Sequence, residues 1–310
     1  LGLVGSEMCI RDSGQTDSGM TIIEGNLFLN GQKPIQERTS FGLGEILNAA
    51  LDNDAKHIII SLGGIGSFDG GAGMLQALGA KFYDDEANLV DVTKGAHVIK
   101  YIRRLDFSGI HPKLAEANIQ VMSDFSSRLY GKQSEIMQMY PMLGMTQNEA
   151  AEIDNLVWYF SELFKSELRV TIGPIERGGA GGGIAAVLNG LYQAEILTSH
   201  ELVDQITHLE DLVQQADLII FGEGLNERDQ LLETTTLRIA DLTEKHHKTS
   251  IAICATDDKF DLFEGKGVTA MFNTFIEMPE SYTDFKMGLQ IRHYTVQALK
   301  LLKTQFDVNK

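Results

Sequence analysis

The chain has 310 residues, of which 43% are hydrophobic and 22% charged, so it can bury a large core and two domains are expected. Its formal net charge of -17 argues against nucleic acid and anionic membranes as partners, because an acidic surface repels both. No apolar run reaches the roughly 18 residues that a membrane span needs. The two cysteines, Cys9 and Cys254, form no disulfide framework or zinc cluster, which predicts a cytoplasmic protein.

The predicted elements begin after the segment LGLVGSEMCIRDS, which matches neither a signal peptide nor the start of a helix or strand. We interpret residues 1–13 as a foreign or artefactual segment, and we expect the chain proper to begin near residue 14 without its original start. Apolar patterns then predict strands at 20–24, 58–60 and 119–123, and helices at 39–53 and 149–167.

From residue 201 onward, amphipathic helices alternate with short apolar strands. Helices are predicted at 201–215, 230–246 and 282–304, and strands at 217–221, 250–255 and 268–272. Such alternation is typical of a parallel sheet that is covered by helices on both faces. The sequence therefore predicts an α/β protein.

A glycine-rich loop follows the strand at 58–60 and leads into a helix near Met74. Backbone N–H groups converge in such a loop and a helix start favours negative charge, so the loop is a candidate phosphate site. Its one acid, Asp69, would repel phosphate unless it binds a metal ion or takes a proton. An alternative of equal weight is a tight turn in which Asp69 caps the helix. The candidate phosphate-binding glycines of this loop are Gly63, Gly64, Gly70 and Gly71.

Two further glycine clusters carry charged residues. Arg177 precedes the cluster at 178–183, which leads into another predicted helix. Glu223 lies between two glycines at the carboxyl end of the strand at 217–221, where ligands bind in open parallel sheets. Glu223 could hold a magnesium ion or be only a turn residue, and Asp124 similarly ends an earlier strand. The candidate phosphate-binding glycines of the second cluster are Gly179, Gly181 and Gly182.

These clusters combine backbone donors, carboxylates and a basic side chain, which is the mixture that phosphoryl transfer requires. The sequence contains no G-x-x-x-x-G-K-[ST] motif, so it does not predict an ordinary Walker-type NTPase. A partial G-x-G-x-x-G around Gly179 lacks a preceding strand and an acid for a ribose hydroxyl, which argues against a nicotinamide site.

Several motifs resemble those of the bacterial glycerate kinases of the first class. Residues 39–45, TSFGLGE, are similar to the family's T-[ST]-Y-G-x-G-E segment. Residues 69–79, DGGAGMLQALG, resemble its D-G-G-A-G-M-L-x-A-L-G segment. Residues 216–224, ADLIIFGEG, resemble its A-D-L-V-I-T-G-E-G segment. The similarity runs in order from about Thr21 to Lys303.

The resemblance implies a kinase that uses magnesium and moves the terminal phosphate of ATP to D-glycerate or a similar small hydroxy acid. It implies a Rossmann-like domain with a parallel sheet and an inserted α/β domain with a mixed sheet. Residues 14–215 would form the inserted domain. Residues 216–310 would form the C-terminal half of the Rossmann-like domain, whose N-terminal half we expect to be missing. The implied partners are a nucleotide and a glycerate-like substrate, with a homodimer as one assembly.

The resemblance also gives the candidate residues their roles. Asp69 would be the catalytic base or a metal-positioning acid, and Glu223 a metal or substrate ligand. Arg177 and Asp124 would bind the substrate, and the glycine clusters would bind phosphate groups.

Three positions depart from the family pattern. Phe68 replaces an asparagine, Leu143 replaces a lysine, and Leu225 replaces an arginine. Loss of one charge-assisted contact costs about 1.5–3 kcal/mol, so these changes oppose catalysis. They favour an alternative in which the chain is a non-catalytic paralogue that binds a small molecule or acts in regulation. Both hypotheses stay open at this point.

Overall fold

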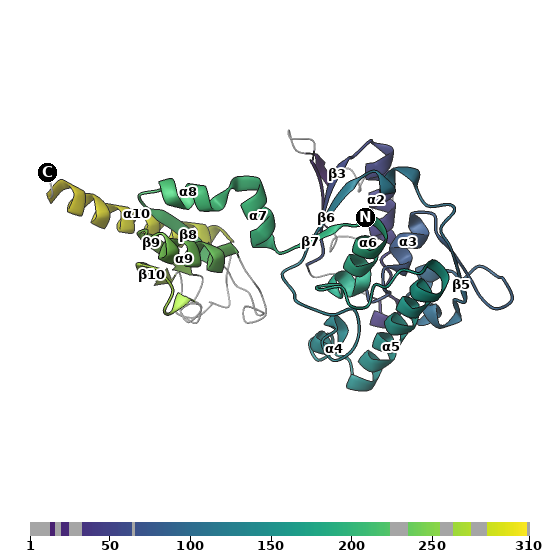
Figure 1. Cartoon of the computed structure of the whole chain (residues 1–310). Helices are drawn as coiled ribbons and strands as arrows, with labels where there is room; N and C mark the ends of the chain where they lie inside the picture. Colours follow the sequence, from purple (N-terminus) through teal and green to yellow (C-terminus); the bar gives the residue numbers. More distant parts are fainter. Residues whose placement is uncertain are drawn as a thin grey trace. The chain divides into compact units, whose positions relative to one another are not determined.

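The computed structural model describes residues 13–15, 20–24, 33–63, 66–223, 235–254, 263–273 and 284–308. The chain divides into two compact units, Leu1–Thr198 and Ser199–Lys310, here called unit 1 and unit 2 (Figure 1). Both units contain parallel strands and helices, so the predicted α/β class is confirmed.

Unit 1 is built on a five-stranded sheet with the strand order β1-β2-β3-β6-β7. The first pair is antiparallel and the other three are parallel, which makes the sheet mixed. The strands at the three predicted positions are present. The bounds are β1 (Ser13–Gln15), β2 (Met20–Glu24), β3 (His57–Ser61), β6 (Asn118–Met122) and β7 (Glu195–Leu197).

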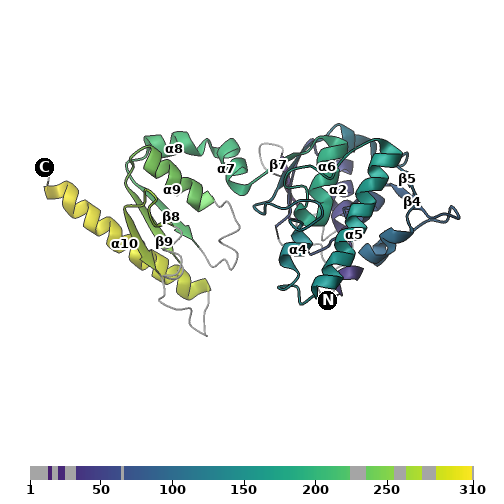
Figure 2. The same ribbon diagram turned by 60° about the horizontal axis from the view of Figure 1, so that its bottom comes forward.

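Helices of unit 1 lie on the same side of this sheet, as Figures 1 and 2 show for α2, α3, α5 and α6. The reason is topological: β2, β3, β6 and β7 follow one another across the sheet in chain order, and right-handed crossovers in one direction place their helices on one face. The bounds are α2 (Phe41–Asp52), α3 (Ala72–Ala77), α4 (Glu135–Met139), α5 (Gln147–Leu163) and α6 (Ile184–Tyr192).

Shorter elements complete unit 1. A two-stranded antiparallel sheet pairs β4 with β5. Helix α5, predicted from its amphipathic pattern at 149–167, begins two residues earlier with a capping box between Thr146 and Glu149. The bounds are β4 (Lys81–Tyr83), β5 (Arg104–Asp106), η2 (Ile35–Glu37), η3 (Val92–Lys94), η4 (Ala96–Tyr101), η5 (Pro112–Ala115), η6 (Phe164–Leu168) and η7 (Ala180–Gly183).

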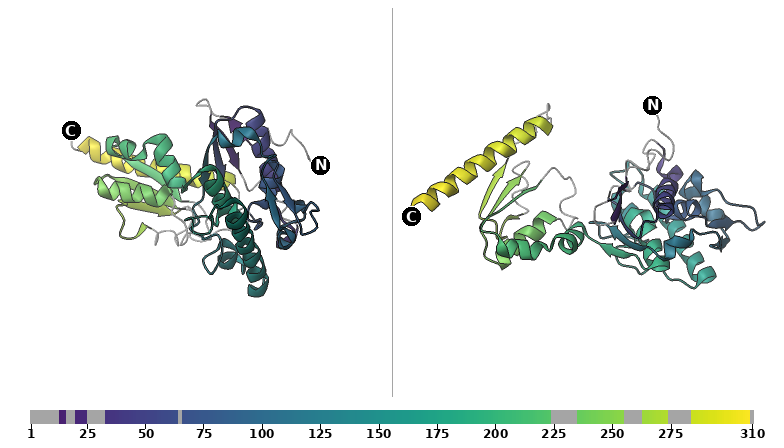
Figure 3. Two further views of the ribbon diagram at one scale, coloured as in Figure 1. Left: turned by 45° about the vertical axis from the view of Figure 1, so that its right-hand side comes forward. Right: turned by 90° about the horizontal axis from the view of Figure 1, so that it is seen from above.

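Unit 2 holds a three-stranded parallel sheet with the order β10-β9-β8. Alternate residues of β9 face opposite sides, as the two-residue period of a strand requires. Ala252 and Cys254 pack in a cluster with Ala240 of α9, whereas Ile251 and Ile253 pack with Ala298 of α10. Figure 3 shows α9 and α10 on opposite faces. The bounds are β8 (Ile219–Glu223), α9 (Thr235–Lys245), β9 (Ser250–Cys254), β10 (Ala270–Asn273) and α10 (Asp284–Val308). Among the described helices, none is long and apolar enough to cross a membrane.

The boundary between the two compact units lies after Thr198. Two helices, α7 (Ser199–Thr207) and α8 (Leu209–Gln215), therefore belong to unit 2. Both helices contact α9, where Arg238 lies 3.1 Å from Asp204 and 3.7 Å from Glu210. The division into an inserted domain at 14–215 and a Rossmann-like half at 216–310 stays a prediction. The predicted single helix at 201–215 is interrupted at His208, whose φ of 51° is left-handed.

Glu210 should make unit 2 sensitive to acid. Hydrogen bonds from Lys245 and His246 lower the pKa of Glu210 to about 2. Since this pKa lies below that of an unfolded glutamate, the stabilisation is present at neutral pH and is lost as the pH falls from about 4.3 toward 2. We expect Glu210→Gln to lower the melting temperature at pH 7 and to flatten its decline below pH 5. Thermal unfolding between pH 7 and pH 3 measures this, with Glu152→Gln on the exposed face of α5 as the control. Identical pH profiles for Glu210→Gln and wild type would contradict it.

Candidate functional site

Loops from three parts of unit 1 meet at the carboxyl edge of the parallel strands. After β3 ends, Leu62 N donates to Met122 O at 2.9 Å, and after β6 ends, Ser123 N donates to Leu197 O at 2.8 Å. The loop that precedes α6 joins them through Gly179, whose N donates to Ser127 O at 3.2 Å. In open parallel sheets, ligands bind at this edge, so these loops form the candidate ligand site of unit 1.

The two glycine clusters of unit 1 pack directly on each other. Gly70 N donates to Gly182 O at 2.9 Å, and Gly182 N donates to Glu135 Oε2 at 3.2 Å. A Cβ built on Gly182 would lie 2.0 Å from Ser67 O, and one on Gly183 would lie 2.8 Å from the Cα of Gly70. These glycines are therefore required for close approach of two backbones, and the N–H groups of Gly70 and Gly182 already have partners in the protein.

Asp69 joins the first glycine loop to the start of α2. Its side chain is 0% exposed. The carboxylate accepts hydrogen bonds from Ser40 N at 2.7 Å and from Ser40 Oγ at 2.9 Å. It also accepts from Gly71 N and Gly73 N, both at 3.1 Å, and from Thr39 Oγ1 at 3.2 Å. Both carboxylate oxygens are thus engaged by donors of the protein itself.

This environment bears on the predicted role of Asp69 as a base or metal ligand. Burial raises the pKa of Asp69 above its ordinary value, and the hydrogen bonds from Ser40, Gly73 and Gly71 oppose that shift. A Mg²⁺ ion needs carboxylate oxygens that are open to it, and both oxygens of Asp69 face N–H and O–H donors. Within the described ranges, no group of three or more His, Cys, Asp or Glu residues could hold a metal ion. The residues around Asp69 therefore do not fit a bound metal.

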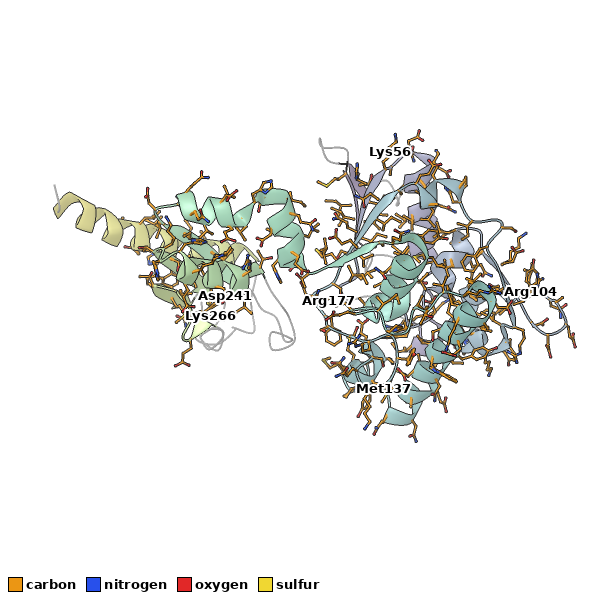
Figure 4. The ribbon with its side chains drawn as sticks, in the orientation of Figure 1. Lys56, Arg104, Met137, Arg177, Asp241 and Lys266 are labelled. Atoms are coloured by element: carbon orange, nitrogen blue, oxygen red, sulfur yellow. The ribbon has the colours of Figure 1, made fainter. Side chains whose placement is uncertain are left out.

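A polar pocket of about 300 Å³ opens beside the second glycine cluster. One wall comes from the loop that follows β6, a second from α4 and the residues before it, and a third from the loop that carries Arg177. Arg177 is labelled in Figure 4. The residues that line it are Ser126, Ser127, Arg128, Gln133, Gln138, Glu176 and Arg177. The predicted substrate residue Arg177 therefore lies in a pocket, together with a second arginine that the sequence patterns did not single out.

The lining of this pocket suits an anion. Arg128 donates through Nη1 to Pro174 O at 3.1 Å, which fixes the direction of its guanidinium group. Ser127 is 3% exposed, and its Oγ has no hydrogen-bond partner among the described residues. A buried hydroxyl without a partner is costly, and a ligand oxygen supplies one only if the loop of Ser127 shifts, because the Oγ itself is shielded from solvent. Two guanidinium groups and such a hydroxyl can bind a carboxylate or phosphate by charge-assisted hydrogen bonds.

The other predicted site residues are scattered. Asp124 is half-buried in the loop after β6, next to the pocket-lining stretch but not in the lining itself. Gly63 is exposed at the end of β3, with open space where a Cβ would be. Gly64 lies outside the described residues. The backbone of Glu223 ends β8 in unit 2, and its side chain lies outside the described part of the chain.

Two of the substituted positions have apolar surroundings. Phe68 is 1% exposed and belongs to a cluster with Ile35, Ile136 and Ile153. Leu143 packs against the same cluster. Both positions therefore contribute to packing under α4 and α5. Leu225 lies outside the described residues.

Sequence reasoning missed Ser126, Ser127 and Arg128. A signal was present, because the three residues follow a predicted strand within a few positions of Asp124, at an edge where ligands bind. Nothing in the sequence indicates that this stretch and Arg177 line one pocket. Their approach depends on the hydrogen bond from Gly179 N to Ser127 O.

Comparison with protein families gives a match to the glycerate kinase family over residues 17–293. Among curated proteins, the chain is similar to glycerate 2-kinase of Escherichia coli, with 31% identity over 76% of this chain and 61% of that protein. It is also similar to glycerate kinase of Halalkalibacterium halodurans, with 29% identity over 81% of this chain and 64% of that protein. The chain thus spans less than two thirds of the length of these two relatives.

A solved structure has the same fold. It is a putative glycerate kinase 2 from Salmonella typhimurium, to which the chain is 27% identical with a TM-score of 0.77. The superposition covers 94% of this chain and 79% of the other. Some more distant relatives, from Synechocystis and Mycobacterium bovis, are uncharacterised proteins.

Proposed function

The chain belongs to the glycerate kinase family, and we propose that it transfers the terminal phosphate of ATP to D-glycerate or a similar small hydroxy acid. The family implies the use of ATP, and the relatives named glycerate kinase support the choice of acceptor. The proposal includes a finer description of the fold. Unit 2 would be part of a Rossmann-like domain, and unit 1 would be the domain inserted into it.

The observation that carries the proposal is the pocket beside the second glycine cluster. D-Glycerate is an anion with two hydroxyl groups, and this pocket places Arg128 and Arg177 near the buried hydroxyl of Ser127. The lining holds two arginines against one glutamate, Glu176, so it carries an excess of positive charge in a protein with a net charge of -17. The pocket is therefore our candidate for the acceptor site.

The side chains of the pocket have separable tasks in this proposal. Arg177 and Arg128 pair with the carboxylate of the substrate and fix its orientation. The hydroxyl of Ser127 makes a hydrogen bond with a substrate oxygen, which gives this buried group the partner that it lacks among the described residues. Holding the acceptor in one orientation contributes to phosphoryl transfer, which depends mainly on positioning and charge stabilisation.

Magnesium is expected with ATP, but Asp69 does not offer it an open oxygen, and we assign no step to it. Among the proposed phosphate-binding glycines, Gly63 has an exposed position at the carboxyl end of β3 that a ligand can approach. The N–H groups of Gly70, Gly71 and Gly182 would have to exchange their present partners.

A second candidate function is a protein that binds a hydroxy acid without turnover. The burial of Asp69 and the packing of Phe68 in a hydrophobic cluster favour it, because neither residue then supplies a polar group to a reacting substrate. The pocket would serve this function equally well.

Measurement of ADP formation with D-glycerate and with glycerol as acceptors separates the two functions. We expect ADP formation that depends on D-glycerate and is absent with glycerol, which has no carboxylate for the arginines. Binding of D-glycerate by calorimetry without ADP formation would support the binding protein. Absence of turnover together with absence of nucleotide and glycerate binding would contradict both.

A further inference from the structure

The groups around the Asp69 carboxylate are arranged so that they donate hydrogen bonds to it. Ser40 Oγ accepts a hydrogen bond from Met74 N at 2.9 Å, and Thr39 Oγ1 accepts one from Phe41 N at 3.3 Å. Because both hydroxyl oxygens accept from backbone groups, their hydrogens are left to point at the carboxylate. The remaining partners of Asp69 are backbone N–H groups, which can only donate.

Such a set of converging donors is what an external phosphate or carboxylate would require. In this protein the carboxylate of Asp69 fills it, at hydrogen-bond distances of 2.7–3.2 Å. A second anion at the same donors would have to displace a buried charge. The first glycine loop therefore already contains its anion.

The loop that Asp69 fixes is in turn in contact with the pocket-lining segment. Gly70, next to Asp69, donates to Gly182 O at 2.9 Å. On the other side of the same cluster, Gly179 N donates to Ser127 O at 3.2 Å, and a Cβ on Gly179 would lie 2.6 Å from Ser127 Oγ. The second cluster thus lies between the loop of Asp69 and the wall that carries Ser127 and Arg128.

We propose that Asp69 is a positioning residue, an internal anion that ties the start of α2 to the first glycine loop and, through Gly182 and Gly179, holds the wall of the pocket. It is neither the base nor a metal ligand of the reaction. The positioning role of Asp69 is argued from the hydrogen bonds alone, whereas its effect on turnover rests on the proposed function.

Rescue by an external anion tests the structural part without turnover. Asp69→Ala leaves the donor set without its acceptor, and we expect the melting temperature to fall by roughly 10 °C. Sodium formate at about 100 mM should bind the same donors and recover part of the lost melting temperature, whereas sodium chloride should not. The control is Asp84→Ala, which removes a carboxylate that accepts from Glu86 N and Asn88 N on an exposed turn. An equal effect of formate on both variants and wild type would overturn the proposal.

Asp69→Asn gives a second test if the alanine variant does not fold. We expect a lower melting temperature, a larger rise in KM for D-glycerate than fall in kcat, and an unchanged pH profile and magnesium requirement. Loss of a general base would instead reduce kcat by about 10²–10⁴-fold. A variant with the wild-type melting temperature that loses turnover to that extent, or that needs much more magnesium, would contradict the positioning role. If wild type shows no turnover, the proposed function fails, while formate rescue still decides the role of Asp69.

Discussion

Arg177→Gln is expected to raise the KM for D-glycerate by roughly 10- to 100-fold, because it removes a charge-assisted contact of about 1.5–3 kcal/mol to the substrate carboxylate. The effect on kcat should be smaller, since the same contact is made in the ground state and in the transition state. Steady-state kinetics at fixed ATP measure both parameters. Arg177→Lys should restore part of the affinity, because it returns the charge without the planar fork.

Arg169→Gln is a closely matched control. Arg169 is exposed, and its left-handed backbone with φ 59° resembles that of Arg177 with φ 55°. The same substitution is then made in the same backbone conformation, at an exposed residue outside the pocket lining and at a half-buried residue within it. Equal KM values for the two variants would show that Arg177 does not contact the acceptor.

Gly182→Ala should be among the most destabilising single substitutions in unit 1. The φ of Gly182 is 63°, and the added Cβ would lie 2.0 Å from Ser67 O and 2.7 Å from the Cα of Phe68. Both contacts are with backbone, which cannot rotate away, so the two glycine loops must separate. We expect a loss of about 3–5 kcal/mol in the free energy of unfolding. Chemical denaturation measures it.

Gly144→Ala is a control that separates the cost of the steric clash in Gly182→Ala from the cost of placing alanine in a left-handed backbone conformation. Gly144 has a similar φ of 70°, but a Cβ added to it would have nothing within 4 Å. It should lose only about 1 kcal/mol, the cost of a left-handed non-glycine residue. Similar losses of unfolding free energy in both variants would contradict the claim that close packing of the two loops requires glycine at position 182.

Much of the fold follows from local patterns in the sequence. The isoleucines of β3 predict a buried strand, and the spacing of apolar residues predicts the amphipathic helix α5, because both patterns are local properties of the sequence. The unit boundary could not be predicted in this way. It depends on which helices pack together in three dimensions, and the contacts of α7 and α8 with α9, such as those of Arg238 with Asp204 and Glu210, are set by tertiary structure.

The candidate site was harder to predict than the fold. A glycine loop with one acid has the same sequence whether the carboxylate points outward to a metal or inward to Ser40, and the direction depends on where α2 starts. The same glycine-rich sequence pattern is also expected whether the glycines allow another backbone segment or a phosphate group to approach. The resemblance identified the family correctly, whereas the pocket of Ser127 and Arg128 depends on how two distant loops pack.

The most direct test of the proposed acceptor site is a crystal structure of the wild-type protein with D-glycerate bound. We predict that the carboxylate lies in the pocket, within hydrogen-bond distance of the Arg177 guanidinium group and the Ser127 hydroxyl, while Asp69 keeps its bonds to Ser40 and Gly73. Glycerate bound at the loop of Asp69, with the pocket empty, would contradict it.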